Sequence, residues 1–211
     1  MNIGKPQPDK RTRLIETAMK LAYRNGFRET SLADIAQAAH VPVGNVYYYF
    51  KTKEELGEAV VERRLAQFRE FREEIDRLSS PKERLFAFVE SIQGKREQLA
   101  RGGCPLGGLC SELQKEGDAL AKKSAALFTE PMGWFEEQFR AAGHEEDARE
   151  LSAHLFCAYQ GMAVVAHAAN DPDLVVNEVK RLKDWLGTLW RPNDRATGAI
   201  DRKEKNDESN A

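Results

Sequence analysis

The 211-residue chain is predicted to be an all-α protein, with a helix-turn-helix module at its N-terminal end and a larger helical body behind it. Three observations predict this fold class. Apolar residues recur at three- and four-residue spacing through most of the chain, which is typical of amphipathic helices. Prolines and glycines interrupt this pattern at intervals that suit helix ends. Residues 30–53 carry cap, turn and helix-breaking residues at the spacing of two short helices joined by a tight turn.

The first helix of this motif is expected to begin at two N-cap residue types, Thr30 and Ser31, and Asp34 adds a negative charge to its first turn. It must end before Pro42, which has no backbone donor and restricts the preceding residue to extended conformations. A second helix over about residues 43–50 follows at once. In a helix-turn-helix unit this second helix enters the major groove of DNA.

The second helix contains three consecutive tyrosines, at positions 47–49, which cannot all share one helix face. Val46 and Phe50 are four residues apart and are expected to anchor the helix inward. Contact with DNA gives exposed aromatic residues a role, whereas a generic helical hairpin with surface tyrosines is the alternative. The residues expected to contact base edges or the groove floor are Val43, Gly44, Asn45 and Tyr48. Those expected to contact phosphates are Thr30, Ser31, Tyr47, Tyr49 and Lys53.

The helix that follows the motif is expected to be capped by Thr52, with Glu55 as the capping-box partner. Lys53 then lies at the start of this helix, where the macrodipole disfavours a cation. A bound phosphate would explain a lysine at this position.

The DNA-binding domain of TetR-family transcriptional regulators resembles two runs of this chain, TSLADIA from Thr30 and VPVGNVYYYFKTKEEL from Val41. The resemblance covers about residues 12–61. It implies a regulator, most often a repressor, that binds a double-stranded DNA operator as a homodimer and responds to a small-molecule effector. One departure is His40, because the family usually has glycine at this turn. A non-glycine residue in the left-handed conformation costs about 1 kcal/mol or more, although histidine tolerates that region better than most residues.

Composition and charge agree with a protein that meets DNA at one end. Hydrophobic residues make up 41% of the chain, yet no apolar run approaches membrane-spanning length, and the N-terminus lacks the apolar segment of a signal peptide. We therefore expect a soluble, cytoplasmic protein with no membrane partner. Residues 1–53 hold nine basic and four acidic side chains (+5), whereas the remainder holds 23 basic and 30 acidic ones (−7). A basic module on an acidic body suits a nucleic-acid partner.

The remaining elements are placed by their caps and breakers. Asp9 is expected to cap a first helix that runs to Asn25 and stops at Gly26, and Phe27 is expected to plug the core of the module. A long helix over residues 53–78 then joins the module to the body. The arginines expected to face outward from this long helix are Arg63, Arg64, Arg69 and Arg72.

Further helices are expected in the body, with boundaries at prolines and glycines. Pro131 is expected to kink or split one of them, and Gly143 to end it. The expected ranges are 81–99, a short helix that ends at 114, then 118–142, 145–169 and 173–190.

Residues 101–110, RGGCPLGGLC, are predicted to form a loop, because four glycines and a proline interrupt the helical pattern. The stretch is similar to a Gly-Cys-Pro-Leu-Gly-like turn that lies between pocket-lining helices in several branches of the family. A pocket wall and a structural connector both fit it. The large apolar residues that follow suit either a core or a cavity for an apolar or aromatic ligand. The residues expected to line the pocket are Cys104, Leu106, Leu109, Phe128, Trp134, Phe135, Phe156 and Tyr159.

The two C-terminal helices are both amphipathic, and small residues in the first of them permit close helix approach. Such a pair can form a four-helix interface with its symmetry mate. The residues expected in this dimer interface are Ala158, Gly161, Met162, Val165, Val179, Leu182 and Leu186.

The cysteines suggest at most a thiol sensor. Cys104 and Cys110 are six residues apart, which is not the spacing of a zinc or redox pair, so no metal site is expected. Arg101 could favour a thiolate that senses oxidants or electrophiles, whereas two small buried side chains are the other interpretation. Cys157 is expected in the core. The chain has no recognisable catalytic constellation, so neither an enzyme nor a cofactor is expected.

The predicted domains are a disordered arm over residues 1–8, a DNA-binding domain over 9–53, a ligand-binding and dimerisation domain over 54–191 and a disordered tail over 192–211. The predicted function is a ligand-responsive repressor of transcription that binds a pseudo-palindromic operator. Two alternatives stay open. One is a regulator that senses oxidants or electrophiles through Cys104 or Cys110, and the other is an adaptor on the same fold that binds a protein partner instead of DNA.

Overall fold

The computed structural model describes residues 9–115 and 117–190, and within these ranges the chain forms eleven α-helices and no strand, which confirms the predicted fold class. The expected arm over residues 1–8 and the expected tail over residues 192–211 lie outside the described residues. The helices are α1 (Lys10–Asn25), α2 (Leu32–Ala38), α3 (Val43–Tyr49), α4 (Lys53–Ile75), α5 (Pro81–Gln93), α6 (Arg96–Gly102), α7 (Pro105–Gln114), α8 (Ala119–Ser124), α9 (Ala126–Ala141), α10 (Ala148–Ala169) and α11 (Pro172–Thr188).

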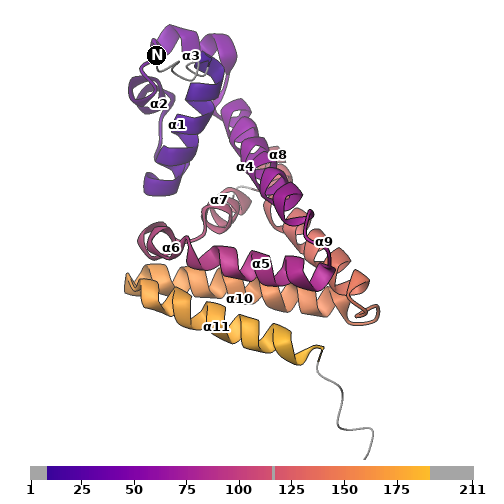
Figure 1. The fold of residues 1–211 in the computed structure, drawn as a ribbon. Helices are drawn as coiled ribbons and strands as arrows, with labels where there is room; N and C mark the ends of the chain where they lie inside the picture. The colour runs from indigo at the N-terminus through magenta and orange to yellow at the C-terminus, as the bar shows by residue number, and fades with distance from the viewer. Residues whose placement is uncertain (1–8, 116, 191–211) are drawn as a thin grey trace, which may run out of the picture.

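Helices α1 to α3 and the first half of α4 enclose the core of the N-terminal module (Figure 1). Leu14, Ile35 and Val46 come from α1, α2 and α3 respectively, and each is fully buried there. Phe27, which was predicted to plug this core, is only 4% exposed. The amphipathic pattern of the first fifty residues therefore folds into a compact support for α3.

The turn between α2 and α3 contains a non-glycine residue in the left-handed conformation. His40 has φ 52°, as expected for this position. The N–H of Val41 donates to the carbonyl of Ala36 at 2.9 Å, which closes α2 in the manner of a Schellman motif. The guanidinium of Arg13 on α1 donates to the carbonyls of Ala39 and His40, the latter at 3.0 Å. These hydrogen bonds fix the turn, and hence the direction of α3, without glycine.

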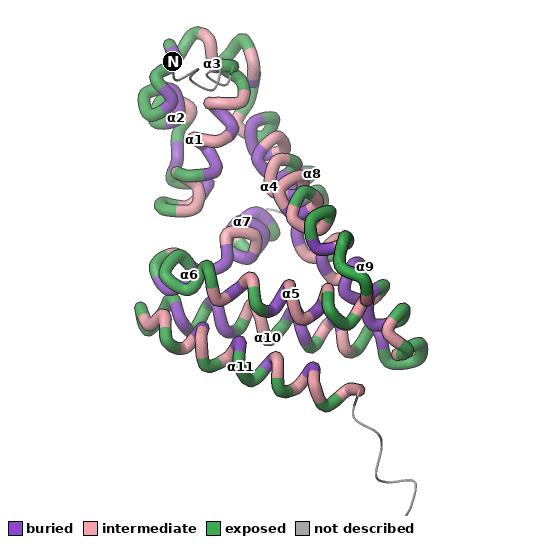
Figure 2. The backbone as a smooth tube through the Cα atoms, in the orientation of Figure 1, coloured by how far each residue is buried: buried purple, intermediate pink, exposed green. Residues whose placement is uncertain are grey.

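Helix α4 connects the module to the body and belongs to the cores of both (Figure 2). Leu56 and Val60 pack in the N-terminal core, whereas Phe68 and Ile75 pack in the core of the body. The helix ends at Ile75 and not at the predicted Leu78, which is 38% exposed beyond it. The predicted domain boundary between residues 53 and 54 would therefore divide the N-terminal core, which includes residues on both sides of it.

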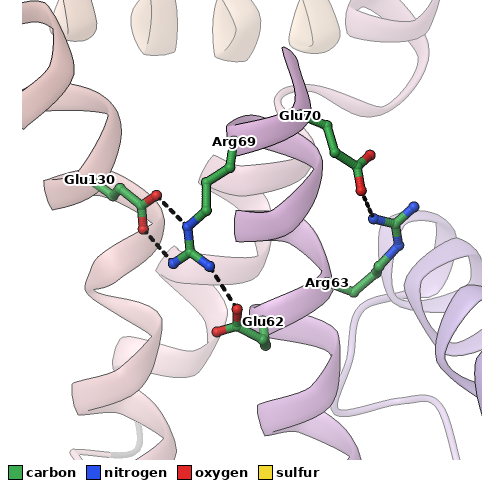
Figure 3. Close-up of polar contacts among 5 residues, drawn as sticks. All are labelled: Glu62, Arg63, Arg69, Glu70 and Glu130. Carbon is green, nitrogen blue, oxygen red and sulfur yellow. Dashed lines mark hydrogen bonds and ion pairs between the residues drawn. The ribbon is translucent and has the colours of Figure 1, made fainter. Parts of the chain in front are cut away.

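In the body, α11 packs along both α5 and α10, and α9 packs against α10, α5 and α4 (Figure 1). Glu130 on α9 forms two hydrogen bonds with Arg69 on α4, at 2.7 and 2.8 Å (Figure 3). Arg69 also donates to Glu62 at 2.8 Å. Arg63 pairs with Glu70 on the side of α4 that faces away from α9. One of the arginines predicted to face outward thus ties α4 to α9.

Two boundaries in the middle of the chain differ from the sequence prediction. The predicted helix over residues 81–99 divides into α5 and α6, because the chain turns at Gly94 after the last residue of α5. The predicted loop over residues 101–110 is largely helical. Cys104 caps α7, and Pro105 occupies its first position, where a missing backbone N–H costs nothing.

Pro131, which was expected to kink or split its helix, does not split it, because α9 contains this proline without ending at it. The expected helix over residues 118–142 instead divides into α8 and α9 at Ala125, which has no helix-breaking side chain. Pro131 lies in the second turn of α9, where one intrahelical donor is lost and the rest of the helix continues.

Candidate functional site

Helix α3 presents several side chains to solvent. Tyr48 is 75% exposed, Tyr47 is 50% exposed and Val43 is 46% exposed. Gly44 is exposed as well, and Asn45 is half-buried. These five residues, all predicted to contact DNA, are accessible on one short helix, and none of them is needed to fill the core of the module.

Three other predicted DNA contacts have roles inside the module. Thr30 is 2% exposed and its hydroxyl donates to a backbone carbonyl at 2.8 Å, so it belongs to the core and is withdrawn as a phosphate contact. Tyr49 is half-buried against the same core, with its ring edge-on to Tyr48 at 5.0 Å between centroids. Ser31 is exposed and forms a reciprocal capping box with Asp34.

Lys53 has an intramolecular partner at the start of α4. Its ammonium group donates to the carbonyl of Arg28 at 2.6 Å, which explains a cation in this first turn without a bound phosphate. Thr52 caps α4 and accepts from the N–H of Glu55, as predicted. The capping box is only half formed, because the carboxylate of Glu55 accepts from the N–H of Lys51 and not from that of Thr52.

Two side chains join the N-terminal module to the body. Glu112 on α7 accepts hydrogen bonds from two successive backbone N–H groups of the loop after α1, at 2.8 and 2.7 Å. The hydroxyl of Tyr23 on α1 donates to the carbonyls of Gln98 and Gly103, at 2.7 and 3.1 Å. Burial raises the pKa of this hydroxyl. Any shift of α6 or α7 would therefore displace groups that hold α1.

A cavity of about 240 Å³ lies in the body, among residues of α4, α5, α6, α7, α9 and α10 and the link between α5 and α6. Six of its fourteen lining residues are aromatic, and its polar part carries two cationic and two amide side chains. The lining residues are Arg64, Gln67, Phe68, Phe71, Phe88, Lys95, Gln98, Leu99, Pro105, Leu106, Pro131, Phe135, Phe156 and Tyr159.

Half of the predicted pocket residues line this cavity, namely Leu106, Phe135, Phe156 and Tyr159. The other four do not line it. Cys104 is in contact with the hydroxyl of Tyr159, and Phe128 packs edge-on against a lining ring. Trp134 is buried and donates its indole N–H to Asp76 at 3.1 Å. Leu109 packs in the N-terminal core.

Arg64 lines the cavity, although it was predicted to face outward. It is half-buried, and its guanidinium donates to the side-chain oxygen of Gln67 at 3.3 Å and to the carbonyl of Met19 at 3.4 Å. Burial lowers the pKa of this guanidinium. A signal was present in the sequence: Arg64 lies four residues after Val60 and four before Phe68, on the apolar stripe of α4.

Lys95 is the second missed cation, and it lies in the turn between α5 and α6. The residue as a whole is exposed, but its ammonium group lies 5.0 Å from the centroid of the Phe71 ring, and partial burial lowers its pKa. Gly94 is the only local signal of this turn, so the position of Lys95 at a pocket could not be predicted from the pattern of residues.

The two neighbouring cysteines differ in their surroundings. Cys104 is 5% exposed, and its sulfur accepts from the N–H of Gly107 and from the amide of Gln160, at 3.4 and 3.5 Å, while its thiol donates to the hydroxyl oxygen of Tyr159 at 3.4 Å. Cys110 is also buried, and burial raises the pKa of its thiol, which disfavours a reactive thiolate. Among the described residues, no group of three or more His, Cys, Asp or Glu is arranged to hold a metal ion.

Helix α10 carries an exposed apolar face. Val164 is 64% exposed and Val165 is 56% exposed, and Gly161 lies on the same helix and is exposed too. Cys157 is also exposed, so its predicted place in the core is wrong. Of the residues predicted for a dimer interface, Gly161 and Val165 are accessible, and Ala158 is half-buried against the body core.

The remaining predicted interface residues are buried inside the subunit. The apolar stripe of α11 packs on α5 and α10, so it is buried within one subunit and is not available to a partner. On α10, Met162 is 6% exposed. On α11, Val179 is 1% exposed, Leu182 is 2% exposed and Leu186 is 0% exposed. They belong to the core of the body and are withdrawn as interface residues.

A helix-turn-helix with an accessible second helix, carried on a helical body that encloses a cavity, defines a DNA-binding transcriptional regulator. Comparison with known families agrees. Residues 14–60 match the model of bacterial regulatory proteins of the tetR family. Residues 81–177 match the model of the C-terminal domain of LmrA/YxaF-like transcriptional regulators. The chain belongs to the TetR family, whose members are regulators and not enzymes.

Individual relatives extend over most of the chain. The HTH-type transcriptional repressor ComR of Escherichia coli is 28% identical over 174 residues, which cover 77% of this chain and 82% of ComR. A TetR transcriptional regulator from Legionella pneumophila has a TM-score of 0.74 at 21% identity, covering 87% of this chain and 98% of that one. The reduced form of E. coli NemR has a TM-score of 0.72 at 18% identity, covering 83% and 96%. The two solved structures show a shared fold.

Within the described residues, no helix combines the length and the apolar character needed to cross a bilayer.

Proposed function

We propose that this chain is a cytoplasmic, ligand-responsive repressor that binds a pseudo-palindromic DNA operator as a homodimer and leaves it when a small apolar or aromatic effector binds. The observation that carries the proposal is the accessible side of α3. The module that presents α3 is hydrogen-bonded to the body through Tyr23 and Gln98, and Gln98 also lines the cavity. The name of the relative ComR, a transcriptional repressor, supports repression over activation.

The contacts with DNA are assigned from exposure. Val43, Gly44, Asn45 and Tyr48 are proposed to reach base edges or the groove floor. Tyr47, Ser31 and Lys53 are proposed to approach phosphates from the borders of α3. Lys53 would use the same ammonium group that now bonds a carbonyl, since an ammonium has three donors.

The dimer is proposed to form through the exposed face of α10. In a two-fold dimer the two α3 helices would enter successive major grooves, whose centres are about 34–36 Å apart on B-DNA. An effector that prefers a different spacing of the two modules would release the operator by a population shift, with a coupling of about 1–3 kcal/mol.

The first test is binding of the purified full-length chain to the DNA immediately upstream of its own gene. Fluorescence anisotropy at two salt concentrations, against a scrambled duplex of equal length, measures both affinity and selectivity. Selective binding that weakens as salt rises is expected. Equal binding to both duplexes, followed by failure to enrich any sequence from random DNA, would favour the adaptor that binds a protein partner.

Asn45→Ala tests the proposed base contact. It should remove about 1–3 kcal/mol of discrimination between operator and scrambled DNA, because an amide side chain can form paired hydrogen bonds with adenine. Asn25→Ala is the matched control, since Asn25 is exposed at the far end of α1. An equal loss of affinity for both duplexes with Asn45→Ala would contradict base readout.

A second candidate function is sensing of oxidants or electrophiles through Cys104. Its specific support is that two N–H groups, the backbone N–H of Gly107 and the side-chain amide of Gln160, donate to the sulfur. The similarity to NemR, of which a reduced form has been solved, points the same way. Cys104→Ser should abolish release of DNA by a reactive inducer if this version holds, and should leave release by a reversible ligand intact if it does not.

A further inference from the structure

The cavity of the body has a charge character that an apolar effector would not use. Among the described residues that line it are two cations, Arg64 and Lys95, and no carboxylate. Neither cation has an ion-pair partner within the described part of the chain, although other arginines of α4 are paired, such as Arg63 with Glu70. A half-buried guanidinium without a counter-ion is costly, and this cost is what an anionic ligand would relieve.

The position of Arg64 suits an anchor for an anion. Its guanidinium is held by the side-chain oxygen of Gln67 and the carbonyl of Met19, at 3.3 and 3.4 Å, which are long for hydrogen bonds of a guanidinium. These neutral contacts satisfy some of its five donors and leave a planar fork available for a carboxylate. Burial lowers the pKa of Arg64, which agrees with a cation that lacks a charged partner.

The aromatic part of the cavity wall determines which apolar group of a ligand can fit. Six aromatic residues line the cavity, among them Phe88, Phe135 and Phe156, whose rings pack edge-on or tilted against one another. The volume of about 240 Å³ is small for a ligand pocket, since typical pockets measure about 300–1,000 Å³. A dry apolar cavity of about 150 Å³ accepts benzene, so this one has space for a single ring that carries a carboxyl group.

We propose that the effector is a small organic anion, a carboxylate on a one-ring or similarly sized apolar body, with Arg64 binding the carboxylate and Lys95 closing the charged end of the cavity. This inference rests on the proposed function, because it names the ligand class of that regulator. It also couples ligand binding to the DNA-binding module through Arg64. Arg64 donates to Met19 of α1, so a carboxylate that draws the guanidinium into the cavity removes a contact between α4 and α1.

The test compares carboxylates with neutral amides of the same shape. Benzoate and benzamide, and phenylacetate and phenylacetamide, are titrated into the purified protein at pH 7.5 by isothermal titration calorimetry. Each carboxylate should bind at least about tenfold more tightly than its amide, a difference of about 1.4 kcal/mol. Equal affinity within both pairs, or no binding by either carboxylate, would overturn the proposal.

Variants of α4 separate a ligand contact from a structural role. Arg64→Gln should abolish the preference for carboxylates, and Arg64→Lys should keep part of it, because charge remains without the fork. Arg63→Gln is the matched control: Arg63 is the neighbouring arginine, pairs with Glu70 and does not line the cavity. If Arg64→Gln behaves like Arg63→Gln, Arg64 has only a structural role and the proposal fails.

Lys95→Gln keeps the test valid if Arg64→Gln fails to fold, because Lys95 is exposed. It should weaken carboxylate binding about two- to fivefold and leave amide binding unchanged. DNA binding is measured separately by anisotropy. Selective DNA binding without a carboxylate preference overturns the ligand class alone, whereas a carboxylate preference without DNA binding overturns the proposed regulator and leaves the ligand class standing.

Discussion

At the scale of single residues, the direction of α3 depends on a conformation that few side chains adopt. His40 is the left-handed residue of the turn, and its side chain is exposed. Its backbone conformation is therefore fixed by Arg13 and by the hydrogen bond between Val41 and Ala36, and not by packing of the imidazole. The contacts around this residue keep its backbone in a strained, left-handed conformation.

His40→Gly should raise the free energy of unfolding by about 0.5–1 kcal/mol. Relief of the left-handed strain is worth about 1–2 kcal/mol, and the extra freedom of glycine in the unfolded chain offsets part of it. Urea unfolding followed by circular dichroism measures the change. His40→Val is the control in the opposite direction, because a β-branched residue tolerates this region poorly. A glycine variant no more stable than the original would show that histidine is unstrained here.

At the scale of elements, the sequence predicted most helices and the accessible residues of α3, because caps, prolines and periodicity act locally. The division between α8 and α9 at Ala125 was missed, since that residue carries no breaker and the break follows from how the two helices pack. Ten of the fourteen residues that line the cavity were not predicted, and Lys95 shows a similar reason. Lys95 reaches the cavity only because α6 folds back, which no local pattern records.

The segment that joins α6 to α7, residues 102–105 (the elbow), lies next to both the cavity and α1. Gly102 ends α6, and a Cβ atom at this position would overlap the ring of Tyr23. Tyr23 is held there by the carbonyls of Gln98 and Gly103, so its ring cannot move aside without losing those hydrogen bonds. Gln98 also lines the cavity.

Gly102→Ala should lower the free energy of unfolding by about 1–2 kcal/mol, because the loss of the Tyr23 hydrogen bonds exceeds the gain in helix propensity. Urea unfolding measures the change. Gly108→Ala is the matched control, since α7 has open space around that position and alanine there should be neutral or stabilising. Similar results for the two variants would mean that Tyr23 adapts freely, and that the elbow does not hold α1.

At the scale of the whole molecule, the exposed apolar face of α10 predicts the oligomeric state. If the proposed dimer forms through this face, Val165→Asp should shift the protein from dimer to monomer at micromolar concentration, because a carboxylate would be desolvated in each half of the interface. Sedimentation equilibrium measures the shift. Leu78→Asp is the control, since Leu78 is an exposed apolar residue after the end of α4. A dimer that survives Val165→Asp would place the interface elsewhere.

The membership of α4 in two cores has a consequence for engineering. A biosensor made by grafting this DNA-reading module onto a foreign sensor body could not be cut at the start of α4, because the module would lose Leu56 and Val60, which belong to its core. A functional chimera has to transplant the matching surface as well, including Leu113 and Leu120. Interchangeable parts of this protein are therefore defined by shared packing and not by position along the chain.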